Sequence, residues 1–203
     1  MKGLPRIEAF VGRTSEMKQL EAILLPDIGH DSERQKLAIL YGMGGIGKTQ
    51  LAVEFARKYC TRFTSVFWLD GRSERSLKHS IADIAGRIPK GQISEASRTY
   101  TQRSNYELDE VVRDVLNWFS IEDHQNWLLI FDNVDNTPMS NDADAYDIND
   151  YIPGADHGSI LVTTRLFGLL EHGKRVEMTT VDDDDALAIL EQRSAQNLKG
   201  RKT

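Results

Sequence analysis

The chain has 203 residues, and 25 Lys and Arg stand against 31 Asp and Glu, so the formal net charge is −6. This acidic balance gives no support to non-specific nucleic-acid binding. No apolar run reaches the roughly 18 residues that a membrane-spanning helix needs. A single cysteine excludes an internal disulfide and a cysteine-based metal cage. We therefore expect a soluble, cytoplasmic protein of one main domain, with neither a nucleic acid nor a membrane as its partner.

Apolar spacing along the chain alternates between helical and strand-like patterns. The first element is a helix predicted over residues 16–25 and capped by Thr14 or Ser15. Continuous apolar runs, typical of strands covered on both faces, predict strands at 36–41, 65–69, 127–131, 159–163 and 175–178. Helical stripes at 51–59, 77–88 and 108–119 lie between the strands. This alternation predicts an α/β fold with a parallel sheet and helices on both faces.

Three stretches depart from the alternation. Residues 89–104 are polar and are interpreted as a mobile insertion. Residues 136–157 contain two prolines and five aspartates without Lys or Arg, and predict a long acidic loop with one helical turn near 147–151. Four consecutive aspartates at 182–185 favour the start of a last helix, which a basic tail follows. We therefore divide the chain into a main domain at 1–181 and the beginning of a further helical part at 182–203.

The strongest chemical signal is a glycine-rich segment that fits G-x-x-x-x-G-K-[S/T]. It directly follows the predicted strand at 36–41 and opens the helix at 51–59, as a phosphate-binding loop requires. Glycines let backbone N–H groups wrap around phosphate oxygens, and the helix N-terminus adds partial positive charge. Lys48 is predicted to reach the β- and γ-phosphates, and Thr49 to offer its hydroxyl to Mg²⁺. The residues assigned to nucleotide binding here are Gly42, Met43, Gly44, Gly45, Ile46, Gly47, Lys48, Thr49 and Gln50.

Two aspartates follow the apolar run at 127–131. Asp132 ends the predicted strand, so its carboxylate is expected in the crevice at the carboxyl ends of the strands, where it holds Mg²⁺. Asp135 is the candidate for orienting or deprotonating the attacking water, although an ordinary loop carboxylate explains it as well. Both predictions depend on the glycine-rich loop upstream, because strands often end at an aspartate that serves a turn.

Two arginines complete the set of motifs. Arg165 follows the predicted strand at 159–163, and a guanidinium there could contact a γ-phosphate and sense its presence. The segment Phe10-Val11-Gly12-Arg13 precedes the first helix. Considered alone it is a short turn flanked by an apolar pair, and Arg165 alone is a surface residue. The order of the four motifs is what favours a functional role for both.

With these motifs in this order, the sequence resembles the NB-ARC domain of the STAND class of P-loop NTPases, and its wording is similar to that of fungal members. These proteins are nucleotide switches of the plant disease-resistance and NOD-like-receptor type. The resemblance implies a five-stranded parallel sheet of order 2-3-4-1-5, in which the sensor strand lies between the P-loop strand and the Walker B strand. It also implies that Val11, Gly12 and Arg13 line the adenine, that Asp132 is the Walker B residue, and that Arg165 is the sensor.

The sequence departs from the family pattern in two respects. Asn133 stands where many relatives carry a second acidic residue, and Asp135 matches the spacing of another branch of the class. The winged-helix motifs that hold ADP in the family do not occur, so the chain is expected to end just after the nucleotide-binding subdomain.

Three functions follow as hypotheses. The first is a switch module that binds ATP and ADP with Mg²⁺, hydrolyses ATP slowly at most, and forms homo-oligomers in the ATP state as relatives do. The second is a P-loop phosphotransferase for a small acceptor, for which Arg98 and Arg103 in the insertion would supply a lid. The third is an interaction fragment that works without nucleotide.

Overall fold

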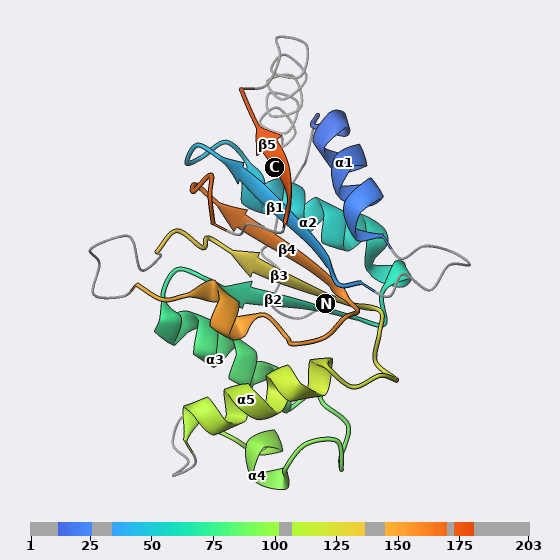
Figure 1. The fold of residues 1–203 in the computed structure, drawn as a ribbon, viewed down its shortest axis with the longest axis vertical. Coiled ribbons are helices and arrows are strands. Elements are labelled where there is room, and N and C mark those ends of the chain that lie inside the picture. The colour runs from blue at the N-terminus through green and yellow to red at the C-terminus, as the bar shows by residue number, and fades with distance from the viewer. Residues whose placement is uncertain (1–11, 26–33, 102–106, 137–144, 170–172, 181–203) are drawn as a thin grey trace, which may run out of the picture.

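A computed structural model describes residues 12–25, 34–101, 107–136, 145–169 and 173–180 (Figure 1). Its centre is a parallel sheet of order β2-β3-β4-β1-β5, so the predicted fold class and strand order are confirmed. The strands are β1 (Lys36–Gly42), β2 (Ser65–Asp70), β3 (Trp127–Asp132), β4 (Ser159–Thr164) and β5 (Lys174–Met178). Each strand lies within one residue of its predicted bounds.

The burial of the strands explains why they can be predicted from the sequence. Every residue of β3 and β4 is buried, because these strands lie inside the sheet and are covered on both faces. β2 and β5 form the two edges and alternate between buried and more accessible positions. The sheet therefore places the ends of β1, β4 and β3 side by side at its centre.

Helices cover both faces of the sheet, which gives a three-layer architecture (Figure 1). α1 (Thr14–Leu24) and α2 (Lys48–Tyr59) pack on one face, and α3 (Glu74–Ala85) and α5 (Leu108–Phe119) pack on the other. Short helices connect them: a 3₁₀ turn at Cys60–Arg62, α4 (Glu95–Arg98) and a 3₁₀ turn at Ile148–Tyr151.

The two faces of the sheet belong to separate hydrophobic clusters. Leu128 and Ile130 of β3 point toward α1 and α2, whereas Leu129 and Phe131 point toward α3 and α5, as the period of two in a strand requires. Among the described residues, no buried side chain belongs to both clusters.

The beginning of α1 differs from the prediction. The helix begins at Thr14, so Thr14 and Ser15 lie inside it and neither caps it. The N-cap is Arg13, in the left-handed region at φ 62°, and its carbonyl accepts a hydrogen bond from the N–H of Met17 at 3.0 Å. The Arg13 side chain donates a hydrogen bond to Ile46 in the glycine-rich loop, as described below, and this contact holds the residue that precedes α1.

The interpretation of residues 89–104 as a mobile insertion is wrong for its described part. Ser97 is fully buried and donates to Asp114 of α5 at 2.6 Å, while Ser94 caps α4 and contacts the same carboxylate. The indole N–H of Trp118 donates to Gln92 at 2.6 Å. Polar contacts with α5 therefore pack this segment, although its sequence lacks an apolar stripe.

Other predictions fall partly outside the described residues. The helical turn expected near 147–151 is confirmed as the 3₁₀ turn at Ile148–Tyr151, whereas 137–144 lie outside the described residues. Val11, Arg103 and the division at 182–203 also lie outside them. Within the described part of the chain, no helix has both the length and the apolar character required to cross a membrane.

Candidate functional site

The glycine-rich loop joins the end of β1 to the beginning of α2, as predicted. Gly42 has φ 152°, and a Cβ there would lie 2.5 Å from the carbonyl oxygen of Met178 in β5, so the close approach of the two strands requires glycine. Gly47 has φ 101° and is the N-cap of α2. These conformations turn the chain abruptly, and the first turn of α2 therefore faces the space above the sheet.

Lys48 is held by the loop itself. Its ammonium donates to the carbonyl oxygens of Gly42 at 2.7 Å and Met43 at 2.9 Å, and its side chain is buried. Burial lowers the pKa of Lys48 below its usual range, and the nearby carboxylate of Asp135 partly offsets that effect. An anionic ligand in the loop would favour the charged ammonium, so Lys48 is suited to a phosphate.

A buried carboxylate lies next to the start of α2. Asp132, the last residue of β3, accepts hydrogen bonds from the hydroxyls of Thr49 at 2.8 Å and Thr163 at 2.6 Å. One hydroxyl and one carboxylate are the protein ligands that Mg²⁺ uses beside nucleotide phosphates, so Thr49 and Asp132 fit that ion. Burial raises the pKa of the Asp132 carboxyl, while the two threonine hydrogen bonds lower it.

Replacing Asp132 by asparagine is expected to stabilise the nucleotide-free protein by about 1 kcal/mol at pH 7.5. The folded-state pKa lies above the unfolded value, so the ionised carboxylate costs stability as pH rises through the folded pKa. The asparagine variant avoids this cost, and its advantage should shrink toward pH 4. Urea unfolding across this pH range measures it, with exposed Asp123→Asn as the control. A less stable Asp132→Asn variant would show that the threonine hydroxyls require a full negative charge.

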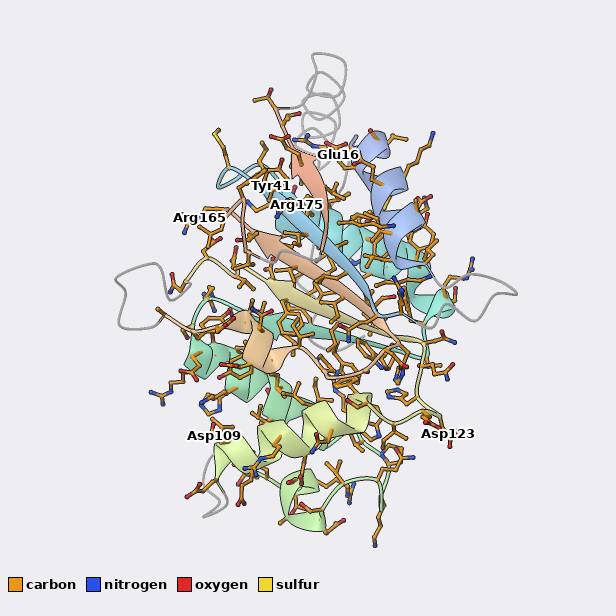
Figure 2. All side chains as sticks on the ribbon, in the orientation of Figure 1. Glu16, Tyr41, Asp109, Asp123, Arg165 and Arg175 are labelled. Atoms are coloured by element: carbon orange, nitrogen blue, oxygen red, sulfur yellow. The ribbon has the colours of Figure 1, made fainter. Side chains whose placement is uncertain are left out.

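Asp135 and Arg165, predicted separately, form one ion pair. The Arg165 backbone N–H donates to Asp135 Oδ1 and its Nε donates to Oδ2, both at 2.6 Å. Arg165 remains largely exposed, and in Figure 2 it lies at the same end of the sheet as Tyr41, the penultimate residue of β1. The arginine predicted as the sensor therefore forms an ion pair with the aspartate predicted as the base.

The segment before α1 reaches the glycine-rich loop. The Arg13 guanidinium donates to the carbonyl of Ile46 at 3.3 Å and to Glu16 at 2.9 Å, and its side chain is buried. Gly12 has φ 81°, which is favourable for glycine. Arg13 therefore contacts the loop, whereas the prediction that Gly12 and Arg13 line an adenine stays a prediction. Val11 is outside the described residues.

The glycine-rich loop and the residues that follow β2, β3 and β4 border a cleft of about 570 Å³, whereas Gly12, Arg13 and Asp132 are not among the residues that line it. Met43 is exposed at the tip of the loop, and Gly42 lies in β1 rather than in the cleft. The residues that line the cleft are Gly44, Gly45, Gly47, Lys48, Thr49, Gln50, Arg72, Asn133, Asp135, Asn136 and Arg165. Sequence reasoning missed three participants. Arg72 and Asn136 lie in connections without a motif, and the contact of Thr163 with Asp132 depends on strand register.

Comparison with known proteins shows a family match over most of the chain. The family described as the NB-ARC domain matches residues 15–199, which include the glycine-rich loop, Asp132, Asp135 and Arg165. A "nucleotide-binding leucine-rich repeat (NLR)-like protein" of Hyaloscypha variabilis is 26% identical over 204 residues. That alignment covers 94% of this chain but 19% of the relative, so the chain spans about a fifth of that protein.

Solved structures share the fold at low identity. Cdc6p from Pyrobaculum aerophilum superposes with a TM-score of 0.61, covering 97% of this chain and 51% of that one. A STAND protein with a tetratricopeptide repeat sensor from Pyrococcus horikoshii gives 0.54, covering 93% and 26%. The Aeropyrum pernix ORC1 protein, solved in complex with DNA, gives 0.59, covering 96% and 52%. All three are 17% identical to this chain.

The sheet order and the glycine-rich loop beside Asp132 agree with a family match that spans nine-tenths of the sequence. This chain belongs to the NB-ARC domain family of nucleotide-binding P-loop NTPases.

Proposed function

We propose that the chain is an adenine-nucleotide switch module that binds ADP and Mg²⁺·ATP and hydrolyses ATP slowly at most. The observation that carries this proposal is the hydrogen bond between Thr49 and Asp132 at the start of α2, directly beside the loop that holds Lys48. When bound, Mg²⁺ would supply charge neutralisation between the β- and γ-phosphates. Thr49 and Asp132 orient that ion, Lys48 binds the phosphates, and Gly12 and Arg13 close the adenine side.

The biological setting is also proposed, from the family and from the NLR-like relative. A nucleotide switch of this type would act in cytoplasmic immune signalling and would form homo-oligomers in the ATP state. The ORC1 protein was solved in complex with DNA, but the net charge of −6 on this chain argues against non-specific binding of nucleic acid here.

The phosphotransferase alternative rested on Arg98 and Arg103, of which only Arg98 lies within the described residues. Arg98 pairs with Glu95 on α4, and its backbone carbonyl lies beside Gly86 at the end of α3, whereas the cleft lies at the beginning of α3. Arg98 is therefore in no position to close over a substrate in the cleft.

Titration calorimetry with ADP and with Mg²⁺·ATP tests the proposal on the purified chain. Saturable binding of both nucleotides, with Mg²⁺ strengthening only the binding of ATP, is the expected result. A folded protein that binds neither nucleotide would favour the interaction fragment instead. Phosphate release that requires a small acceptor would favour the phosphotransferase.

Lys48→Ala is expected to weaken ATP binding about ten- to hundredfold, because one or more charge-assisted contacts to phosphate are lost. The melting temperature should change by only a few degrees, since the Lys48 ammonium donates to two neutral backbone carbonyls, those of Gly42 and Met43, and its removal leaves no unpaired charge. Lys58→Ala is a matched control on the same helix, where the lysine pairs with Glu21 at the surface. Unchanged calorimetric affinity in Lys48→Ala would refute the assignment of the loop.

A further inference from the structure

A second arginine borders the cleft. Arg72 lies two residues after the end of β2, and it lines both the 570 Å³ cleft and an adjoining hollow of about 430 Å³. The hollow is also bordered by Asp70 and Asp132. Arg72 and Asn133 are common to both spaces, so the Arg72 side chain stands at the boundary between them.

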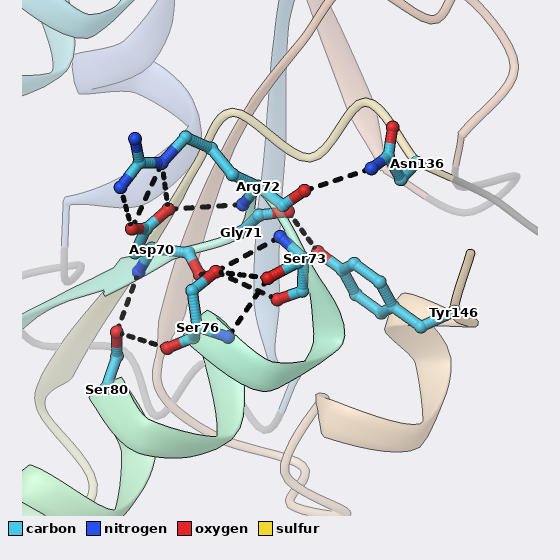
Figure 3. Close-up of polar contacts among 8 residues, drawn as sticks. All are labelled: Asp70, Gly71, Arg72, Ser73, Ser76, Ser80, Asn136 and Tyr146. Carbon is cyan, nitrogen blue, oxygen red and sulfur yellow. Dashed lines mark hydrogen bonds and ion pairs between the residues drawn. The ribbon is translucent and has the colours of Figure 1, made fainter. Parts of the chain in front are cut away.

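The main chain that carries Arg72 is firmly held (Figure 3). The N–H of Gly71 donates to the carbonyl of Asp132 at 2.7 Å, and the Tyr146 hydroxyl donates to the carbonyl of Gly71 at 2.6 Å. Asn136 donates to the carbonyl of Arg72 at 3.0 Å. A Cβ on Gly71 would lie 2.6 Å from a methyl group of Val134, so the backbone packs directly on the chain after β3. The Cα of Arg72 is thus fixed relative to Asp132.

The side chain, by contrast, is accessible. The side chain of Arg72 is 71% exposed, and its guanidinium forms a fork on Asp70, with Nε–Oδ1 and Nη2–Oδ2 distances of 2.9 and 2.5 Å (Figure 3). Exposed ion pairs contribute little to stability, so leaving Asp70 costs little. A phosphate offers the same planar fork a partner with more negative charge in a partly enclosed cleft.

Strand order fixes where such a phosphate would be. The ends of β1, β4, β3 and β2 follow one another across the sheet and carry the glycine-rich loop, Arg165, Asp132 and Arg72, respectively. In the β2–β3 register Asp70 is opposite Asp132. A triphosphate that extends from the loop toward Asp132 would therefore have its terminal phosphate between Arg165 and Arg72.

We propose that Arg72 binds the γ-phosphate of Mg²⁺·ATP and is stored on Asp70 when that phosphate is absent. The inference rests on the proposed function and deepens it, because it names a residue that distinguishes ATP from ADP. The arrangement parallels the ion pair of Arg165 with Asp135. Each arginine that would contact the terminal phosphate therefore has a carboxylate that binds it when no nucleotide is present.

Calorimetry on the full chain tests this with two ligands, ADP and a non-hydrolysable ATP analogue with Mg²⁺. In Arg72→Ala the affinity for the analogue should fall about tenfold, while that for ADP stays within about twofold. In Arg72→Lys the affinity for the analogue should fall by less than in Arg72→Ala, because lysine keeps the positive charge although it lacks the guanidinium fork. Asp70→Asn should raise the affinity for the analogue by roughly two- to fivefold, since Arg72 leaves a weaker partner. Arg98→Ala removes an arginine from another local ion pair and should change neither affinity.

The outcomes separate the two proposals. If the wild-type protein binds neither ligand, the proposed function fails. If it binds both and Arg72→Ala is unchanged, or loses affinity equally for both ligands, the role of Arg72 is overturned while nucleotide binding stands. A loss of analogue affinity in Asp70→Asn, or in Arg98→Ala, would likewise overturn it. Melting temperatures of all variants, measured without ligand, verify that each is folded.

Discussion

Asp135→Asn is expected to abolish ATP hydrolysis while Mg²⁺·ATP still binds with nearly wild-type affinity. General-base assistance is commonly worth about 10²–10⁴ in rate, and asparagine cannot accept the proton. The neighbouring Asn133 cannot replace the carboxylate as a base, so we also expect turnover by the wild-type protein to be slow. Single-turnover phosphate release together with calorimetry for the ATP analogue measures the two effects separately.

Because Asp135 forms an ion pair with Arg165, the kinetics of Asp135→Asn distinguish a role of Asp135 as a base from a role in positioning Arg165. Both oxygens of Asp135 accept hydrogen bonds from Arg165, so we expect Asp135 Oδ2 to be available as a base after the Arg165 guanidinium has turned toward a phosphate. A variant that loses ATP affinity but keeps its turnover would show that Asp135 serves to position Arg165. Asp150→Asn, an exposed aspartate in the same connection between β3 and β4, is the control.

Gly158→Ala is expected to destabilise the fold by on the order of 3–5 kcal/mol. Gly158 has φ 85°, and a Cβ there would overlap three atoms of the Trp127 indole. The indole cannot move away, because it is fully buried and its N–H donates to the carbonyl of Phe119 at 3.0 Å. The carbonyl of Gly158 is also fixed, by the N–H of Lys36 at 2.9 Å. Thermal unfolding should show a melting temperature lower by roughly 6–20 °C.

Two other glycines separate the causes. Gly91 has φ 89° with open space around it, so Gly91→Ala reports the backbone strain alone, about 1 kcal/mol. Gly154 has neither a positive φ nor a close neighbour, and Gly154→Ala should be neutral. Equal melting temperatures for all three variants would show that the Trp127 indole can move away from the added Cβ, which would contradict the expectation for Gly158→Ala.

Much of the fold could be predicted because the central strands are buried on both faces. Every position of β3 and β4 is buried, and their apolar runs, Trp127–Phe131 and Ile160–Val162, end one and two residues before the strands end. The start of α1 could not be predicted, because Arg13 is anchored by Ile46, a residue of the distant glycine-rich loop. α4 was missed since a four-residue helix has no periodicity and depends on the contact between Ser97 and Asp114.

The residues of the site also differ in whether a local sequence pattern predicts them. Lys48 and Thr49 belong to a local pattern that specifies its own loop and helix, and both lie at the start of α2 beside that loop. Their contacts with phosphate and Mg²⁺ stay predictions. Thr163, one of the two partners of Asp132, lies in β4, and Arg165, the partner of Asp135, directly follows that strand, so strand register brings these pairs together. Arg72 had no motif at all. Its position follows from the edge strand β2 and the close packing of Gly71, which no local sequence signal reveals.

The separation of the interior into two hydrophobic clusters has a consequence for amide hydrogen exchange. Arg13 and α2 belong to the side of the sheet covered by α1, whereas Arg72 lies at the start of α3 on the opposite side. Cooperative opening units in proteins tend to follow such divisions. A ligand that contacts only the glycine-rich loop should slow exchange mainly in α1 and α2, and one that also binds Arg72 should extend the protection across the sheet into α3. The pattern of protected amides, more than its total, would then report which phosphate is bound.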